Sequence, residues 1–253
     1  MPGVKKAKHD ELYGTDAAWR VSRKVGRAIG EFKLLENGDH VLCAISGGKD
    51  SLTMLDQLAR WSEKLPFRIR LTAVHVKTDF HCGGCVHDRV LGQFFDERRV
   101  PGHFLFTEVV KTAPNGQMSC FHCARRRRIA LFRLAADLGC NKVALGHHLD
   151  DIVETTLMNM CFNGTFTTML PRMDLFDGRM AIIRPLALCL ESEVVEYVGD
   201  RAFHRQLCRC PYGRDSMRAR MKALIKQLEG LYPDVRQNLF ASQFKIGAQP
   251  EIQ

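Results

Sequence analysis

Short apolar stretches alternate with amphipathic stretches between residues 40 and 145, and this alternation restricts the fold more than any other feature. The apolar stretches have the length of strands and cover residues 40–45, 70–76, 103–109 and 142–145. The stretches between them carry apolar side chains at helical spacing and cover residues 51–62, 86–98 and 121–138. Strands that alternate with helices form right-handed crossovers. The sequence therefore predicts an α/β fold, with a parallel sheet sandwiched by helices.

The two ends of the chain are expected to be helical. Val21, Val25 and Ile29 recur at helical spacing within residues 16–34. After Gly146 the expected elements are helices at residues 150–163, 191–200 and 216–229, an irregular stretch at 164–179 and an extended stretch at 180–184. The expected division is an N-terminal helical segment (1–34), a central domain (35–185) and a basic helical C-terminal extension (186–253).

The composition limits where the protein is expected to be located and which partners it can have. The chain of 253 residues has no apolar run long enough for a spanning helix, and its start lacks the apolar stretch of a signal peptide. We therefore expect a cytoplasmic protein without a membrane partner. In that reducing compartment the ten cysteines indicate metal binding or sulfur chemistry and not a disulfide framework.

The charge favours a polyanionic partner. The formal net charge is +9, and residues 201–253 alone carry ten Lys and Arg against four Asp and Glu. Nucleic acid would satisfy this excess, although solvated helix faces produce the same count.

The sharpest motif is Ser46-Gly47-Gly48-Lys49-Asp50-Ser51, between an apolar strand and a helix. Two glycines let the backbone approach an anion, and a helix start favours negative charge. The spacing differs from that of the P-loop NTPases. A tight turn capped by Asp50 or Ser51 is the alternative, but a cap explains neither both glycines nor the lysine.

The same six residues resemble the PP-loop of the ATP pyrophosphatases. Three further stretches resemble the tRNA-thiolating branch of that superfamily: Cys120 to Cys123 with the arginines at 125–128, Gly146 to Asp151, and Ile183 to Leu186 with Glu191 beyond. Their order and spacing are most similar to the tRNA 2-thiocytidine synthetases. The resemblance extends from about residue 18 to residue 244.

This resemblance implies an enzyme that cleaves ATP to AMP and pyrophosphate, adenylates the O2 oxygen of a tRNA cytidine and replaces that oxygen with sulfur. The implied cofactors are ATP, Mg²⁺ and a [4Fe-4S] cluster. The implied partners are tRNA and a sulfur donor such as a cysteine desulfurase. The sequence leaves the oligomeric state open, a homodimer included.

The resemblance also assigns residues to the site. The expected ATP-binding residues are Ala44, Ser46, Gly47, Gly48, Lys49, Asp50, Ser51, Gly146 and His147. The expected catalytic residues are Asp50, Asp151 and Arg127, with Asp150 as a candidate magnesium ligand. The alternative for at least one of the two adjacent acids is a helix cap or a helix-start acid that meets the dipole.

Two cysteine pairs stand out. Cys120 and Cys123 are spaced for metal ligation or thiol chemistry, and the resemblance adds Cys210 as the third ligand of the [4Fe-4S] cluster, with Cys208 as its neighbour. Zinc is the main alternative at this site. Cys82 and Cys85, flanked by His81 and His87, lie outside the resemblance. A redox pair, a zinc site and a plain glycine loop remain open for them. The other cysteines expected in the core are Cys43, Cys140, Cys161 and Cys189.

Arginines are the candidate tRNA contacts. Four consecutive arginines at 125–128 point around a whole helical turn, so one or two of them should meet phosphate. The expected RNA-binding residues are Arg125, Arg126, Arg128, Arg184, Arg214, Arg218 and Arg220. Arg127 has either a catalytic or an RNA-binding role. Arg184 has a structural ion pair as its alternative.

The sequence is also compatible with other functions. One is a PP-loop enzyme that thiolates uridine or acts on another substrate. Lysidine formation needs no sulfur site, so the cysteines disfavour it. A non-catalytic zinc-dependent RNA-binding module is the alternative from another class, and Lys49, Asp50 and Asp151 disfavour that interpretation.

Overall fold

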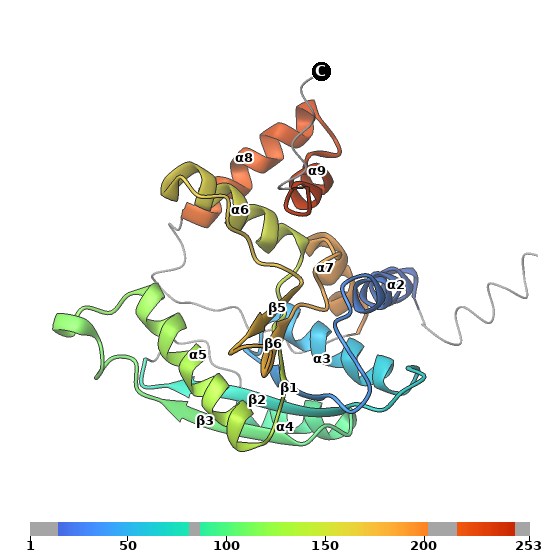
Figure 1. Cartoon of the computed structure of the whole chain (residues 1–253), viewed down its shortest axis with the longest axis vertical. Helices are drawn as coiled ribbons and strands as arrows, with labels where there is room; N and C mark the ends of the chain where they lie inside the picture. The colour runs from blue at the N-terminus through green and yellow to red at the C-terminus, as the bar shows by residue number, and fades with distance from the viewer. Residues whose placement is uncertain (1–14, 81–86, 202–216, 246–253) are drawn as a thin grey trace, which may run out of the picture.

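A single sheet organises the computed structural model, which describes residues 15–80, 87–201 and 217–245. The strands of the described residues lie in the order β3-β2-β1-β4-β6-β5 (Figure 1). Their bounds are β1 (His40–Ala44), β2 (Arg70–Thr78), β3 (Gly102–Thr107), β4 (Lys142–Ala144), β5 (Arg172–Leu175) and β6 (Met180–Ile183). The pairs from β3 to β6 are parallel, which confirms the expected α/β sheet.

Helices cover both faces of this sheet. Their bounds are α2 (Asp16–Glu31), α3 (Lys49–Ser62), α4 (Asp88–Glu97), α5 (Cys120–Asp137), α6 (Leu149–Asn163), α7 (Glu191–Asp200), α8 (Met217–Leu231) and α9 (Val235–Ser242), with a short 3-10 turn η1 (Pro114–Gly116) before α5. Alternate side chains of β1 point to opposite faces. Val41 and Cys43 join the core that contains residues of α2, α3, α4 and α7, whereas Leu42 joins a smaller core under α5.

The β5–β6 hairpin is a departure from the sequence expectation. Residues 164–179 were expected to be irregular, but Arg172–Leu175 form a strand that pairs antiparallel with β6. Residues 176–179 connect the two strands, and Phe176, Asp177 and Gly178 among them have positive φ. Such a tight left-handed turn returns the chain directly beside itself, so the last pair of the sheet is antiparallel.

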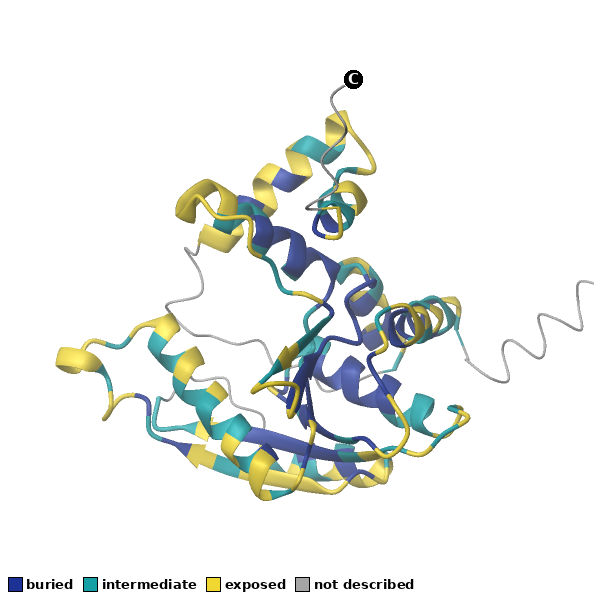
Figure 2. Cartoon of the chain, in the orientation of Figure 1, coloured by how far each residue is buried: buried dark blue, intermediate teal, exposed yellow. Residues whose placement is uncertain are grey.

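The C-terminal helices lie at the edge of the molecule. Figure 1 shows α8 and α9 beside α6, at the end away from β3. Figure 2 shows that the central strands are buried, that α8 is mostly exposed and that α9 is mostly of intermediate burial. Helix α9 was not expected, because its eight residues are too few to show a clear period. No helix of the described residues is long and apolar enough to cross a membrane.

Three of the four cysteines expected in the core are buried there, namely Cys43, Cys140 and Cys189. Burial raises the pKa of the Cys140 thiol to about 11. Cys161 is exposed near the end of α6, so its assignment to the core is wrong. The apolar residues around Cys161 in sequence lie on an open end of α6, where Met160 and Phe162 are exposed as well.

Candidate active site

A cavity of about 400 Å³ opens at the carboxyl ends of β1, β2 and β4. Strand β1 lies between β2 and β4 in the sheet. The strands β2 and β3 lie on one side of β1, and the later strands β4, β5 and β6 lie on the other side, so the strand order reverses at β1. Ligands of open α/β sheets bind where the strand order reverses in this way. Expected site residues that line the cavity are Ala44, Ser46, Asp50, Ser51, Arg127, Arg128, Gly146, His147, Asp151 and Arg218. Gly47, Gly48 and Lys49 complete the loop between Ser46 and Asp50.

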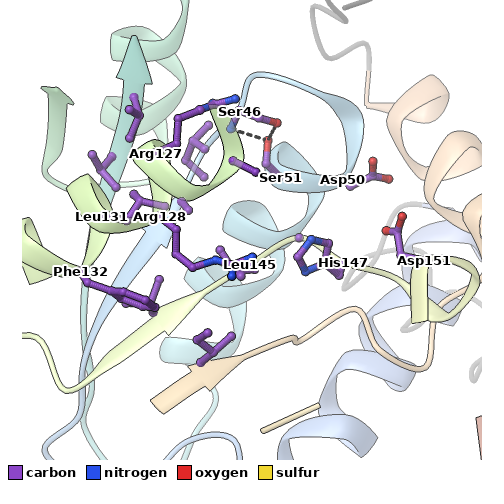
Figure 3. Close-up of a pocket in the computed structure, with 18 of the residues that line it drawn as sticks. Ser46, Asp50, Ser51, Arg127, Arg128, Leu131, Phe132, Leu145, His147 and Asp151 are labelled. Carbon is purple, nitrogen blue, oxygen red and sulfur yellow. Dashed lines mark hydrogen bonds between the residues drawn. The ribbon is translucent and has the colours of Figure 1, made fainter. Parts of the chain in front are cut away.

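Hydroxyl groups hold the glycine loop in shape. The Ser51 hydroxyl donates to the Gly48 carbonyl at 3.0 Å and accepts from the Ser46 amide at 3.1 Å. The Ser46 hydroxyl lies 3.1 Å from the Ser51 hydroxyl and accepts from the Gly48 amide at 3.2 Å (Figure 3). Gly47 has φ of +86°, which favours glycine. No side chain of the described residues caps α3, so its first amides remain available to an anion.

Gly146 brings the end of β4 against this loop. A Cβ atom at residue 146 would lie 2.9 Å from the backbone carbonyl of Asp50 and from the Ser51 amide. Only glycine allows that approach. The two motifs that the sequence singled out thus meet at one wall of the cavity.

Lys49 is held by two carboxylates. Its ammonium donates to both oxygens of Asp50 at 3.0 Å and lies 3.2 Å from Glu191 Oε1. Burial lowers the pKa of Lys49, but the nearby charges of Asp50 and Glu191 outweigh it and raise this pKa. Glu191 also accepts from Lys222 of α8. Burial opposes its ionisation, yet the hydrogen bond from Lys222 and the charge of Lys49 lower the pKa of Glu191 to about 2.

His148 connects the two carboxylates expected to be catalytic. Its Nε2 atom lies 3.7 Å from Asp50 Oδ1 and 3.5 Å from Asp151 Oδ2. His148 also begins α6 through a capping box: its Nδ1 accepts from the Asp151 amide at 3.3 Å, and its own amide donates to Asp151 at 3.2 Å. Asp151 therefore lines the cavity, as expected of a catalytic residue, and also takes part in the helix cap that was the alternative to a catalytic role.

Asp150 faces away from the cavity. Its carboxylate accepts from Arg236 of α9 and, at 2.7 Å, from the Glu191 amide. Neighbouring residues of a helix lie about 100° apart, and here Asp151 lines the cavity whereas Asp150 does not. This arrangement supports the structural alternative for Asp150, and its magnesium role stays a prediction.

Arg218 of α8 reaches α6 at the cavity mouth. Its guanidinium donates to Asp151 Oδ1 at 3.3 Å and to the Thr155 hydroxyl at 3.2 Å, and it lies 3.6 Å from Glu154 Oε2. Burial raises the pKa of Glu154 to about 7, against the opposing charge of Arg218. The C-terminal extension thus supplies a side chain to the cavity itself.

His147 lines the cavity, and the buried Arg184 lies behind it. Arg184 Nε donates to His147 Nδ1 at 3.3 Å, and the guanidinium also donates to the Leu170 carbonyl. Burial and the charge of Arg184 lower the pKa of His147 to about 4. Arg184 is only 4% exposed. The described residues show Arg184 bound to a ring nitrogen and a carbonyl and not in the expected ion pair, and its burial differs from the exposed position that an RNA contact requires.

The arginines at 125–128 divide among several directions. Arg127 and Arg128 line the cavity, opposite Asp50 and Asp151 in Figure 3. Arg126 turns to the preceding loop, where its Nε donates to the Glu108 carbonyl at 3.3 Å. Arg125 is exposed. Only part of the expected RNA-binding set is therefore displayed on the surface.

The two described cysteines of the expected metal centre begin α5. Ser119 caps this helix by accepting from the His122 amide at 3.1 Å. Cys120 is exposed and Cys123 is partly buried. Because residues four and seven apart share a helix face, Cys120 lies on the same stripe as Ala124 and Arg127 of the cavity wall. Cys120, an expected ligand of the cluster, thus lies on the face of α5 that also borders the expected ATP-binding cavity.

Several expected residues lie outside the described part of the chain. These are Cys82, Cys85, Cys208, Cys210 and Arg214. Arg220 is described and exposed on α8. No group of three or more His, Cys, Asp or Glu in the described ranges is arranged to hold a metal ion.

Sequence reasoning did not assign His148, Glu154, Lys222 or Arg236 to the site. His148 sits inside the expected motif, and Glu154 follows Asp151 by three residues on the same helix. These two could have been found from helical spacing. Lys222 and Arg236 come from distant helices and bind Glu191 and Asp150 beside the site, and no local pattern signals these contacts.

Comparisons with known proteins agree with the family resemblance of the sequence motifs. Residues 19–205 match the family model of the PP-loop domain. A tRNA-cytidine(32) 2-sulfurtransferase of Burkholderia lata is 36% identical over 251 residues, which cover 97% of this chain and 75% of that protein. The protein of the same name from Burkholderia vietnamiensis is 38% identical over 228 residues, covering 88% of this chain and 67% of that protein.

A solved structure shares the fold. It is the U34-tRNA thiolase NcsA from Methanococcus maripaludis with its [4Fe-4S] cluster. The TM-score is 0.74 and the sequence identity is 23%, over 91% of this chain and 78% of that one. This likeness shows the common architecture.

Proposed function

The chain belongs to the PP-loop family of tRNA-cytidine(32) 2-sulfurtransferases, and from this membership we propose that it is an ATP-dependent tRNA sulfurtransferase that makes 2-thiocytidine. The observation that carries the proposal is the cavity itself. One wall is the glycine loop, suited to pyrophosphate, and the other is the helix that begins with Cys120 and Cys123.

In the proposed reaction, the O2 oxygen of cytidine attacks the α-phosphorus of ATP, and the bond to the β-phosphate breaks to release pyrophosphate. The amides at the start of α3 and the Ser46 and Ser51 hydroxyls would bind the departing charge. Asp50 and Asp151 present carboxylates that suit Mg²⁺, and Arg127 presents a guanidinium toward the phosphates. Sulfide then attacks C2 of the base, and AMP leaves with the former O2 oxygen.

Two cysteine thiolates three residues apart fit the donor set of an iron–sulfur cluster. Cys120 and Cys123 would hold it together with Cys210, which lies outside the described residues. When bound, a [4Fe-4S] cluster supplies a site that binds sulfide close to the activated base. We propose a cysteine desulfurase as the class of sulfur donor, a cytoplasmic location, and a homodimer as an assembly to be tested by the mass in solution.

The test is mass spectrometry of nucleosides from tRNA incubated with the anaerobic protein, ATP and sulfide. We expect 2-thiocytidine together with AMP and pyrophosphate, and loss of all three products in Asp151→Asn. The control Glu31→Gln changes an exposed ion pair with Arg27 on α2, no residue of which lines the cavity, and should retain activity. Appearance of 2-thiouridine instead would change the substrate. Absence of AMP with intact tRNA binding would favour a binding module.

A further inference from the structure

The first turns of α5 display an unusual side chain between the two cysteines. Phe121 is 79% exposed, the largest exposed fraction of any large hydrophobic side chain among the described residues. It lies in the first turn of the helix, directly after Cys120. Neither the proposed reaction nor the apolar core uses this ring.

The orientation of α5 is fixed by its neighbours. The His122 ring and the Thr112 hydroxyl lie within hydrogen-bond distance, 3.1 Å apart, and Arg126 donates to the Glu108 carbonyl at 3.3 Å. Asp79 anchors the same loop by accepting from the Val109 amide at 2.6 Å. The side of α5 that carries residues 122 and 126 therefore faces this loop, and the adjacent side remains open.

Phe121 continues into a row of arginines on that open side. Residues 121, 125 and 128 follow the i, i+4, i+7 spacing of one helix face. Arg125 and Arg128 are both exposed, and Arg128 also lines the cavity. We call Phe121, Arg125 and Arg128 the Phe121 stripe. It leads from the predicted cluster ligands to the cavity wall.

The chemistry of the stripe matches a single-stranded nucleotide. Exposed aromatic rings stack on unpaired bases, and guanidinium groups bind the adjoining phosphates. A protein partner would need a wider apolar patch, but the helical neighbours of Phe121 are Ala124 and Arg125. The net charge of +9 adds attraction for a polyanion.

We propose that the Phe121 stripe binds an unstacked nucleotide of the tRNA, with the base on the Phe121 ring and the phosphates on Arg125 and Arg128. This inference rests on the proposed function and specifies how its substrate is held. The thiolated base must leave its stack to enter the cavity. A stacking site beside the cavity would hold such an opened region of the RNA in place.

The test measures binding of a 12-nucleotide oligocytidylate to the full anaerobic chain without ATP. Phe121→Ala should raise its Kd by about fivefold to a hundredfold. Phe121→Leu should bind as weakly as Phe121→Ala, because leucine keeps apolar area but has no aromatic ring. Phe121→Trp should bind as the wild type, and the emission of the new tryptophan should be quenched on binding. A blunt RNA duplex of the same length should show no difference between these variants.

The control is Phe106→Ala, because Phe106 is 59% exposed on β3 and lies outside the stripe. Equal Kd values for the wild type and Phe121→Ala, or wild-type binding by Phe121→Leu, would overturn the stacking site. Loss of iron in Phe121→Ala with unchanged Kd would also overturn it and make Phe121 a cover for the metal centre. Because thiolation is not measured, failure of the proposed function would be seen separately, as absence of 2-thiocytidine.

Discussion

His147 shows how burial sets the state of one side chain in the cavity. Its pKa of about 4 keeps the ring neutral near pH 7. Because Nδ1 accepts from Arg184, the ring hydrogen is assigned to Nε2. His147 can therefore donate one hydrogen bond to a ligand in the cavity, and Arg184 serves to orient it.

Glu154 gives a residue-scale prediction about pH. Its pKa of about 7 lies above the ordinary value of 4.5, so the folded chain binds this proton more tightly than the unfolded chain. The stabilisation from Glu154 is complete below about pH 4.5 and is lost as the pH rises through 7. Gln does not titrate, so Glu154→Gln should not lose stability in this way. The difference in free energy of unfolding between Glu154→Gln and the wild type should therefore grow in favour of the variant from pH 5 to pH 8.

Urea denaturation across that range measures the effect. His147 titrates in both proteins, so its contribution cancels in the difference. Glu196→Gln changes an exposed residue paired with Arg20 and serves as the control. If Glu154→Gln followed the wild-type pH dependence in parallel, the buried, protonated Glu154 would be excluded.

Gly48 gives the second residue-scale prediction. A Cβ atom at this position would meet only the Ser46 hydroxyl, at 3.4 Å, so Gly48→Ala should fold normally. The methyl group should nevertheless block close approach of phosphate to the loop, and the bulkier Gly48→Val more so. We expect the Kd for ATP to rise about tenfold or more, since hydrogen bonds to charged groups contribute about 1.5–3 kcal/mol.

Calorimetry with ATP and Mg²⁺ provides the measurement. Gly146→Ala is the contrasting variant, because its Cβ would lie 2.9 Å from the backbone of Asp50 and should lower stability. Unchanged ATP affinity in folded Gly48→Val would exclude the loop as the pyrophosphate site.

At the scale of elements, periodicity predicted the helices and parallel strands well. Leu52, Leu55 and Leu58 of α3 share a buried face, so the helical pattern was visible in the sequence. Strand β5 escaped detection because its four residues are only partly buried and do not alternate clearly. The two motifs at the ends of β1 and β4 met in one cavity because parallel neighbours end at the same edge.

Helix α8 carries two kinds of basic residue. Arg218 and Lys222 pair with carboxylates of α6 and α7, whereas Arg220 and Lys226 belong to the exposed face of the helix, and all four are exposed. Replacing Arg214 and Arg220 by Gln should weaken tRNA binding and reduce the slope of log K against log salt by about 0.7–0.9 for each lost phosphate contact. A triple variant that also carries Arg218→Gln should in addition have a lower turnover at saturating tRNA, since Asp151, the partner of Arg218, lies in the cavity.

Filter binding at several salt concentrations separates these effects. Arg27→Gln, which removes an exposed pair with Glu31 on α2, is the matched control. Identical slopes for the wild type and the Arg214/Arg220 variant would place the tRNA on another surface.

At the scale of the whole molecule, what sequence could not predict is the contact between distant elements. Lys49, Glu191 and Lys222 belong to α3, α7 and α8, and only tertiary packing brings them together. Arg218 of α8 reaches the cavity through Asp151, while Lys222 and Arg236 bind Glu191 and Asp150 outside its lining. The expected division at residue 185 stays a prediction, as do the roles assigned to the individual site residues.

The metal centre is the prediction that depends on the whole chain. Cys120 and Cys123 begin α5, and Cys210 follows about ninety residues later in the sequence. Three cysteines leave one coordination position open, which a reacting centre requires and a closed structural zinc site does not. Protein purified without oxygen should be brown, with about four irons per chain. Cys120→Ala, Cys123→Ala and Cys210→Ala should each abolish both the colour and thiolation.

Cys161→Ala is the matched control, because Cys161 is an exposed cysteine on α6. Cys82→Ala and Cys208→Ala should likewise keep the colour. Iron analysis and the visible absorbance spectrum check these outcomes before any activity is measured. Stoichiometric zinc in an anaerobic protein that still thiolates tRNA would exclude the iron–sulfur route. If Cys208→Ala lost the iron while Cys210→Ala kept it, the third ligand would be Cys208, and delivery of sulfur from a three-cysteine centre would stand.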